Sequence, residues 1–171
     1  LHTTGEVTHG PDIVAAVPAF AAELAAAHPA AVALRDHRQA LLWRDVDELL
    51  DRVASGLGPQ IDLGPSRRVA VFAENAAETA LAHLGGLLGG ASTVPANFHL
   101  RADEAAFILA DSGSRIVFVG PETAERGAEA ARQSGIPTVV GWHLPSSVAG
   151  ALGVIPWERW LGEQESTALS D

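Results

Sequence analysis

The sequence has 171 residues, 47% of them hydrophobic, a length that suits one well-buried core better than two small domains. Its formal charge of −10 at pH 7 would repel nucleic acid and anionic membrane surfaces, so we expect no nucleic-acid partner. All 11 basic residues are arginine, and lysine and cysteine are absent, which excludes a phosphate-loop lysine, a Schiff base, a thiolate nucleophile, a zinc-thiolate cluster and a disulfide.

The start of the chain predicts a helix, a hairpin and a second helix. Apolar residues at helical spacing indicate a helix over residues 11–27, and the preceding residues 1–10 are expected to form a disordered or tag-like leader. Two short apolar runs, residues 31–36 and 40–43, flank a polar turn and predict a β-hairpin. The next amphipathic stretch predicts a helix over residues 45–57.

The middle of the chain repeats a strand-helix pattern. Short, nearly continuous apolar runs predict buried strands, and Asn75 can cap the first of the helices between them. The expected strands are residues 68–73, 91–95, 115–119 and 137–141, and the expected helices are residues 75–88, 102–111 and 121–133. Alternation of this kind implies an α/β fold: an open doubly wound, mainly parallel sheet flanked by helices, with the N-terminal helix and hairpin appended.

The last part of the chain is punctuated by proline, serine and glycine. Trp157 and Trp160 lie one helical turn apart and are expected to anchor a terminal helix to the core. We expect one domain over residues 11–161 and a flexible tail at a truncation point over residues 162–171. The uncharged stretch of residues 79–100 is broken by glycine and proline, so no transmembrane segment is expected. The absence of cysteine fits a cytoplasmic protein.

The short motifs point away from several kinds of site. Residues 85–92 (GGLLGGAS) nearly match the phosphate-binding pattern G-x-x-x-x-G-K-[ST], but Ala91 stands at the lysine position and the segment closes a helix instead of opening one. We therefore interpret it as helix termination and close packing. Residues 111–114 (DSGS) follow a helix and are interpreted as a loop. Seven histidines show no metal-ligand spacing, so we expect neither a metal site nor a catalytic residue.

Two longer segments resemble one enzyme family. Residues 41–46 (LLWRDV) are similar to its L-T-Y/W-x-E/D-L motif, and residues 88–100 (LGGASTVPANFHL) are similar to its A-G-A-x-x-V-P-x-N segment. With RVAVFAEN before the second segment and ADEAAFILADSGSRIVFVG after it, the order resembles the N-terminal subdomain of adenylate-forming enzymes: fatty acyl-CoA synthetases, peptide-synthetase adenylation domains and luciferases. The VPANFHL form is most similar to the acyl-CoA synthetases. The family usually has a capping threonine where Leu42 and Arg101 stand.

The resemblance implies an AMP-forming fatty-acid–CoA ligase. Such an enzyme joins a fatty acid or another carboxylate to ATP with the help of Mg²⁺, releases pyrophosphate, and passes the acyl group to CoA. The family's phosphate loop, ribose-binding aspartate and catalytic lysine have no counterpart up to Asp171. The chain is therefore interpreted as a fragment, residues 11–161 forming an N-terminal subdomain that is inactive alone and binds none of these cofactors tightly.

The family often has a basic residue near the CoA entrance, and His99 stands at that position. His99 is thus a candidate CoA phosphate contact, with an ordinary surface histidine as the alternative. A fragment would expose surfaces made to pack on other subdomains, which predicts self-association. The alternative function is a stand-alone flavodoxin-like module that binds a small molecule or a partner without catalysis.

Overall fold

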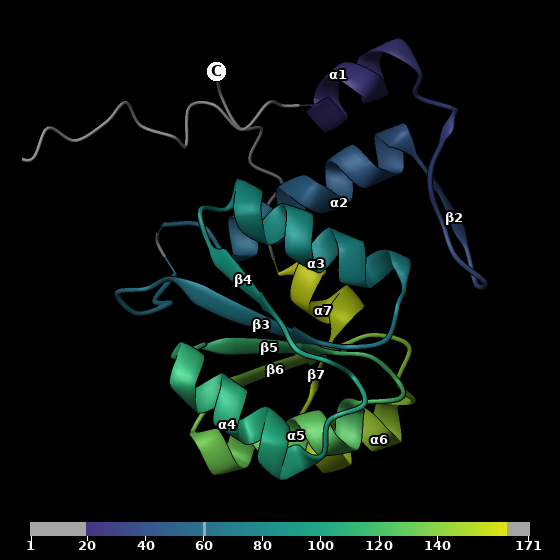
Figure 1. Cartoon of the computed structure of the whole chain (residues 1–171). Helices are drawn as coiled ribbons and strands as arrows, with labels where there is room; N and C mark the ends of the chain where they lie inside the picture. Colours follow the sequence, from purple (N-terminus) through teal and green to yellow (C-terminus); the bar gives the residue numbers. More distant parts are fainter. Residues whose placement is uncertain (1–19, 60, 164–171) are drawn as a thin grey trace, which may run out of the picture.

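The computed structural model describes residues 20–59 and 61–163. A five-stranded parallel sheet forms the centre, in the order β4-β3-β5-β6-β7, and a separate two-stranded antiparallel hairpin, β1-β2, lies beside it (Figure 1). The strands are β1 (Val32–Arg35), β2 (Ala40–Leu42), β3 (Arg68–Phe72), β4 (Ser92–Pro95), β5 (Ile116–Val119), β6 (Thr138–Gly141) and β7 (Ile155–Pro156). The helices are α1 (Phe20–Ala27), α2 (Trp43–Gly56), α3 (Ala77–Leu88), α4 (Ala102–Ser112), α5 (Ala124–Ser134), α6 (Ser146–Leu152) and α7 (Trp157–Gly162).

The two faces of the sheet build two cores. Side chains alternate along a strand, so Val69 and Val71 of β3 join the core on the α2, α3 and α7 side, while Ala70 and Phe72 join the core on the α4, α5 and α6 side (Figure 1). The central strands are buried on both faces, as continuous apolar runs predict. The expected α/β fold with an open, parallel, helix-flanked sheet is confirmed.

The terminal helix is held by aromatic packing. Trp157 and Trp160 are 4% and 6% exposed, and both rings pack edge-on against Phe118 of β5, with centroids 5.8 and 5.4 Å away. Their predicted core role is confirmed. In the part of the chain that the structure describes, no helix is both long and apolar enough to cross a membrane.

Three sequence-based predictions about elements need correction. The segment around β4 was expected to be a buried strand, but β4 pairs only with β3 and is a partly exposed edge strand. Two elements near the end, α6 and β7, were not expected. Asn75 was expected to cap the third helix, but α3 begins at Ala77, and the N-cap residue before it, Ala76, makes no side-chain hydrogen bond to the helix. The expected leader at residues 1–10, the start of the first expected helix and most of the expected tail lie outside the described residues.

The hairpin supplies the cap that Asn75 does not. The Asp36 carboxylate, in the hairpin turn, accepts hydrogen bonds from the backbone N–H groups of Ala77 at 2.9 Å, Arg38 at 2.7 Å and Gln39 at 2.8 Å. These bonds, the one from Ala77 foremost, hold the pKa of Asp36 below its usual range. A residue distant in sequence therefore satisfies the first turn of α3 and fixes the hairpin against it.

The positions where the family usually has threonine keep half of a capping box. The backbone N–H of Leu42 donates to Asp45, and that of Arg101 donates to Glu104 at 2.9 Å. The side chains of Leu42 and Arg101 have no oxygen that could accept a hydrogen bond from a backbone N–H in the first turn of the helix. Only the half of each capping box that uses the acidic side chain therefore forms.

Candidate functional site

The carboxyl end of the sheet gathers the polar side chains that could form a site. In a parallel sheet all strands end at one edge, and here Glu74 follows β3, His99 follows β4, Gly120 follows β5 and His143 follows β6. The chain leaves β3 for β4 on one side and later returns to β5 on the other. The carboxyl ends of the neighbouring strands β3 and β5 therefore form the topological switch point, which is where doubly wound sheets bind ligands.

At the switch point Glu74 lies directly on Gly120. A methyl group added at Gly120 would overlap the Glu74 carboxylate, so the backbone of Gly120 leaves the room that the carboxylate fills. One carboxylate oxygen, Oε2, is buried and has no hydrogen-bond partner among the described residues. Buried oxygens are normally paired, so this one is a ready acceptor for a donor brought to the edge.

Glu78 joins three segments at the same edge. Its side chain, in the first turn of α3, is almost completely buried. Its Oε1 atom accepts a hydrogen bond from Gln39 Nε2 at 2.6 Å, in the hairpin, and lies 3.0 Å from His143 Nε2, which follows β6. His143 holds a left-handed backbone conformation with φ of 55°. Sequence reasoning missed this junction, since its members are far apart in the chain.

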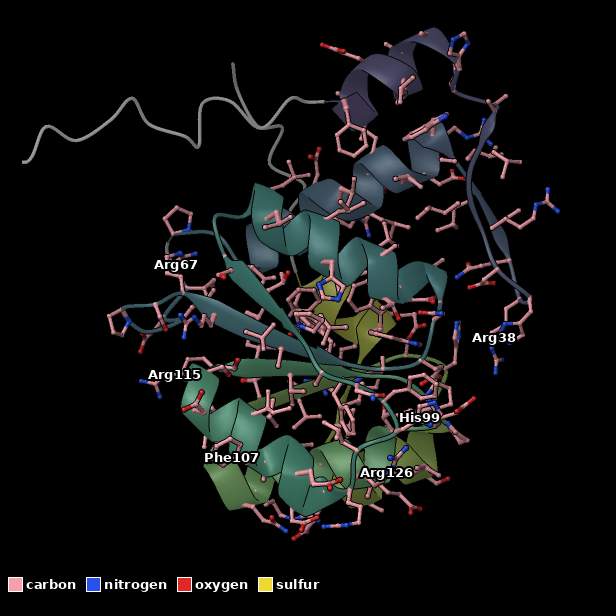
Figure 2. The ribbon with its side chains drawn as sticks, in the orientation of Figure 1. Arg38, Arg67, His99, Phe107, Arg115 and Arg126 are labelled. Atoms are coloured by element: carbon pink, nitrogen blue, oxygen red, sulfur yellow. The ribbon has the colours of Figure 1, made fainter. Side chains whose placement is uncertain are left out.

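His99, the site residue that the sequence predicts, lies exposed beyond the end of β4 (Figure 2). Its ring lies against that of Phe98, with centroids 4.0 Å apart, and its backbone N–H donates to Asn97 Oδ1 at 3.0 Å. The imidazole has no polar partner in the described part of the chain. A ligand that reaches this loop would therefore find the ring free.

Arg126 holds the loop that carries His99. Its guanidinium donates to the carbonyl oxygens of Leu100 and Glu122, and it lies over the ring of Phe72, 5.6 Å from the centroid. Figure 2 shows Arg126 and His99 at the same end of the sheet, opposite Arg67 and Arg115. Arg126 was not identified from the sequence, and its bonds to backbone carbonyls make it a positioning residue for this loop.

The glycine-rich segment packs two helices together, as the sequence predicts. A side chain at Gly85 would overlap Val53 of α2, and one at Gly89 would approach the backbone oxygen of Ala54 to 2.7 Å. Gly90, with φ of 71°, ends the turn after α3. These glycines allow α2 and α3 to approach closely, so they do not form a phosphate loop.

The described residues contain no cluster of metal ligands. Across residues 20–59 and 61–163, no group of three or more His, Cys, Asp or Glu side chains is placed to hold a metal ion. The chain also has no lysine to meet a phosphate. Residues 111–114 were expected to be a loop after the helix, but Asp111 and Ser112 still belong to α4 and only Gly113 and Ser114 follow it. Their hydrogen bonds are local, as predicted: Ser112 Oγ donates to the Leu109 carbonyl at 3.1 Å and lies 2.8 Å from Ser114 Oγ.

Comparison with known proteins matches the sequence to one family. Residues 9–153 match the family described as AMP-binding enzyme. The chain is 34% identical over 99 residues to cyclosporin synthetase simA of Tolypocladium inflatum, a match covering 57% of this chain and 1% of that protein. It is 32% identical over 113 residues to the long-chain-fatty-acid–CoA ligase FadD13 of Mycobacterium tuberculosis, covering 66% of this chain and 22% of the ligase.

A solved structure gives the same fold. A benzoate CoA ligase from Burkholderia xenovorans LB400 superposes with a TM-score of 0.74 at 19% identity, covering 88% of this chain and 29% of that one. The protein is thus an open doubly wound α/β domain with the fold seen in this ligase. It belongs to the AMP-binding enzyme family, and the predicted membership in the adenylate-forming superfamily is confirmed. The chain spans about a fifth of the fatty-acid ligase and far less of the synthetase.

Proposed function

We propose that this chain is the N-terminal part of an ATP-dependent acyl-CoA ligase. In that reaction a carboxylate oxygen attacks the α-phosphorus of ATP, pyrophosphate leaves, and the acyl-adenylate then passes its acyl group to the CoA sulfur while AMP leaves. The observation that carries the proposal is the family match over residues 9–153, supported by the fatty-acid ligase among the relatives. The acid is proposed to be a fatty acid.

We infer that the chain alone does not catalyse adenylation. ATP and Mg²⁺ supply the leaving group and charge neutralisation in this chemistry, and the described residues offer neither a lysine nor a carboxylate cluster to hold them. The role of this chain would then be a scaffold, with the carboxyl edge of its sheet contributing a wall of the site. Its proposed location is the cytoplasm.

His99 is the proposed contact with a CoA phosphate. The supporting observations are its exposure, its imidazole free of other partners, and a loop fixed by Arg126. An imidazole is a weaker phosphate partner than arginine, whose planar guanidinium can bind two phosphate oxygens at once. The contribution of His99 to CoA binding is therefore expected to be small.

A chimera tests the function. Residues 9–153 of this chain would replace the matching segment of the mycobacterial ligase, and ATP–pyrophosphate exchange would be measured with a fatty acid. Exchange that depends on the fatty acid supports the proposal, and a folded chimera without exchange contradicts it. The isolated chain should show no exchange. In the active chimera, H99A should raise KM for CoA and leave exchange unchanged, whereas H28A, at an exposed histidine after α1, should change neither.

Amino-acid activation is a second candidate function. A peptide synthetase is among the relatives at 34% identity, slightly above the fatty-acid ligase. The two enzyme classes share the adenylation step and differ in the acid and in the thiol acceptor. Exchange assays on the chimera with an amino acid in place of the fatty acid distinguish the two functions if residues 9–153 line the pocket that binds the acid. The native full-length protein, assayed with both acids, decides between them.

A further inference from the structure

A cavity of about 440 Å³ lies between the hairpin and the beginning of α3. Its apolar wall is formed by Leu34 of β1 and by Ala76 and Ala80 on the α3 side. Its polar rim is formed by Arg35, His37 and Asn75. A volume of this size falls within the range of small-molecule sites, and an apolar wall with a few polar groups is their usual lining.

The rim carries an arginine and a histidine whose side chains have no hydrogen-bond partner in the described part of the chain. Arg35 and His37 are exposed, and in the described part of the chain neither side chain makes a hydrogen bond or an ion pair. The amide of Asn75 is also exposed and without a partner there. Most other described arginines are engaged with carboxylates or backbone carbonyls, as Arg67, Arg101 and Arg126 are.

The one acidic group of the lining is already occupied. Asp36 stands between Arg35 and His37, and its two carboxylate oxygens accept the three backbone N–H groups that fix the turn. Its negative charge is met by these backbone donors and by the nearby His37, which interacts with it electrostatically. What the cavity presents outward is a guanidinium, an imidazole and a carboxamide above an apolar wall.

We propose that this cavity binds a small organic anion, with its carboxylate or phosphate on Arg35 and His37 and its apolar body on Leu34, Ala76 and Ala80. The planar guanidinium matches the two oxygens of a carboxylate or phosphate. The apolar wall adds burial for a short hydrocarbon chain. The cavity adjoins the carboxyl edge of the sheet, because Asn75 directly follows Glu74. A binding test at the cavity needs no adenylation activity, so its outcome does not depend on the function proposed above.

Direct binding to the whole chain tests the proposal. Amide chemical shifts would be followed by NMR during titration with butyrate, butyl phosphate and butylammonium, three probes that share one apolar body. Butyrate or butyl phosphate should shift the amides of residues 34, 76, 77 and 80 in a saturable way, and the tighter of the two identifies the preferred head group. Butylammonium should not bind. Absence of saturable shifts with both anions, or equal binding of butylammonium, would overturn the proposal.

A matched pair of arginine variants tests the role of charge. R35A should weaken anion binding about tenfold or more, the loss expected for one charged hydrogen bond. R38A removes a neighbouring exposed charge at the tip of the same hairpin, outside the cavity lining, and should leave affinity within about twofold (Figure 2). Equal losses in both variants would mean a general electrostatic effect and would overturn the site.

A third variant tests the apolar wall. A80L enlarges a side chain of the apolar wall so that it fills the cavity, and it alters no charge. It should abolish the butyrate-induced shifts. Binding of butyrate that A80L leaves unchanged would overturn the apolar part of the site. Circular dichroism spectra matching those of the unaltered chain would establish that each variant is folded.

Discussion

Arg67 places its guanidinium among the carbonyl groups at the ends of two helices. It donates to the backbone oxygens of Leu57 and Gly58, after α2, and of Gly89 and Gly90, after α3, with distances from 2.5 to 3.3 Å. The last carbonyls of a helix have no partner within it and carry partial negative charge. One guanidinium thus provides hydrogen-bond donors for carbonyl groups at two helix ends. The backbone of Arg67 itself has a left-handed conformation, with φ of 45°.

We expect R67A to lower the free energy of unfolding by about 2–4 kcal/mol, because it leaves several half-buried carbonyls unpaired. R132A breaks only an exposed i,i+3 ion pair with Glu129 and should cost at most about 0.5 kcal/mol. Urea denaturation of both variants measures the difference. Equal midpoints would contradict the role given to Arg67.

Asp51 gives a pH-dependent prediction. Partial burial raises its pKa, and the neighbouring charge of Asp47 raises it further. The folded protein then binds the proton more tightly than the unfolded chain, so this group lowers stability as pH rises from below 3.8 through the raised folded pKa. D51N should therefore raise Tm at pH 7.

The Tm gain of D51N should shrink as the pH falls and the native aspartate becomes protonated. Melting curves recorded at several pH values between 3 and 7 check this expectation. The pKa of Asp36 is lowered, so its charged form stabilises the folded protein at pH 7. D36N should therefore lower Tm at this pH. The same sign of effect in both variants would contradict the assignment of these shifts.

At the scale of elements, glycine has different consequences in two helices. Gly85 of α3 packs on Val53, where a methyl group would collide, whereas Gly150 of α6 faces open space. Alanine is the better helix former by up to about 1 kcal/mol. G150A should therefore stabilise by several tenths of a kcal/mol or more, and G85A should destabilise by about 1–3 kcal/mol despite its better helix propensity. Thermal unfolding of the pair would contradict the packing argument if both variants gained stability.

The elements show why some predictions succeeded. The strands and helices from β3 to β6 were predicted because buried parallel strands are continuous apolar runs and the helices between them have a clear period. The edge position of β4 was missed, since its sequence is equally apolar whether one neighbour or two flank it. The two residues of β7 are too short to give a pattern.

The candidate site was harder to predict than the fold. His99 came from a resemblance in a continuous segment. The Glu78 junction and the Asp36 cap join residues about forty or more positions apart, and no local sequence pattern indicates such pairs. Arg126 gave no signal because a helix-surface arginine is usually solvated, and only the structure reveals the carbonyls that it meets.

At the scale of the whole molecule, the two most exposed large apolar side chains among the described residues lie on opposite helix layers. Phe107 of α4, labelled in Figure 2, is 72% exposed, and Leu87 of α3 is 51% exposed. We expect concentration-dependent self-association through one of these faces. In sedimentation experiments, F107S should weaken association if the α4 layer is the contact, and L87S if the α3 layer is. A monomer at high concentration in the unaltered chain would contradict self-association.

The contact between Glu74 and Gly120 has a consequence for the evolution of this protein. Because the carboxylate occupies the space of a missing methyl group, a larger residue at 120 must push the Glu74 side chain into another rotamer and draw Oε2 out of its buried position. A shorter residue at 74 removes this conflict, so substitutions at 120 are expected to be accompanied by changes at 74 among close homologues.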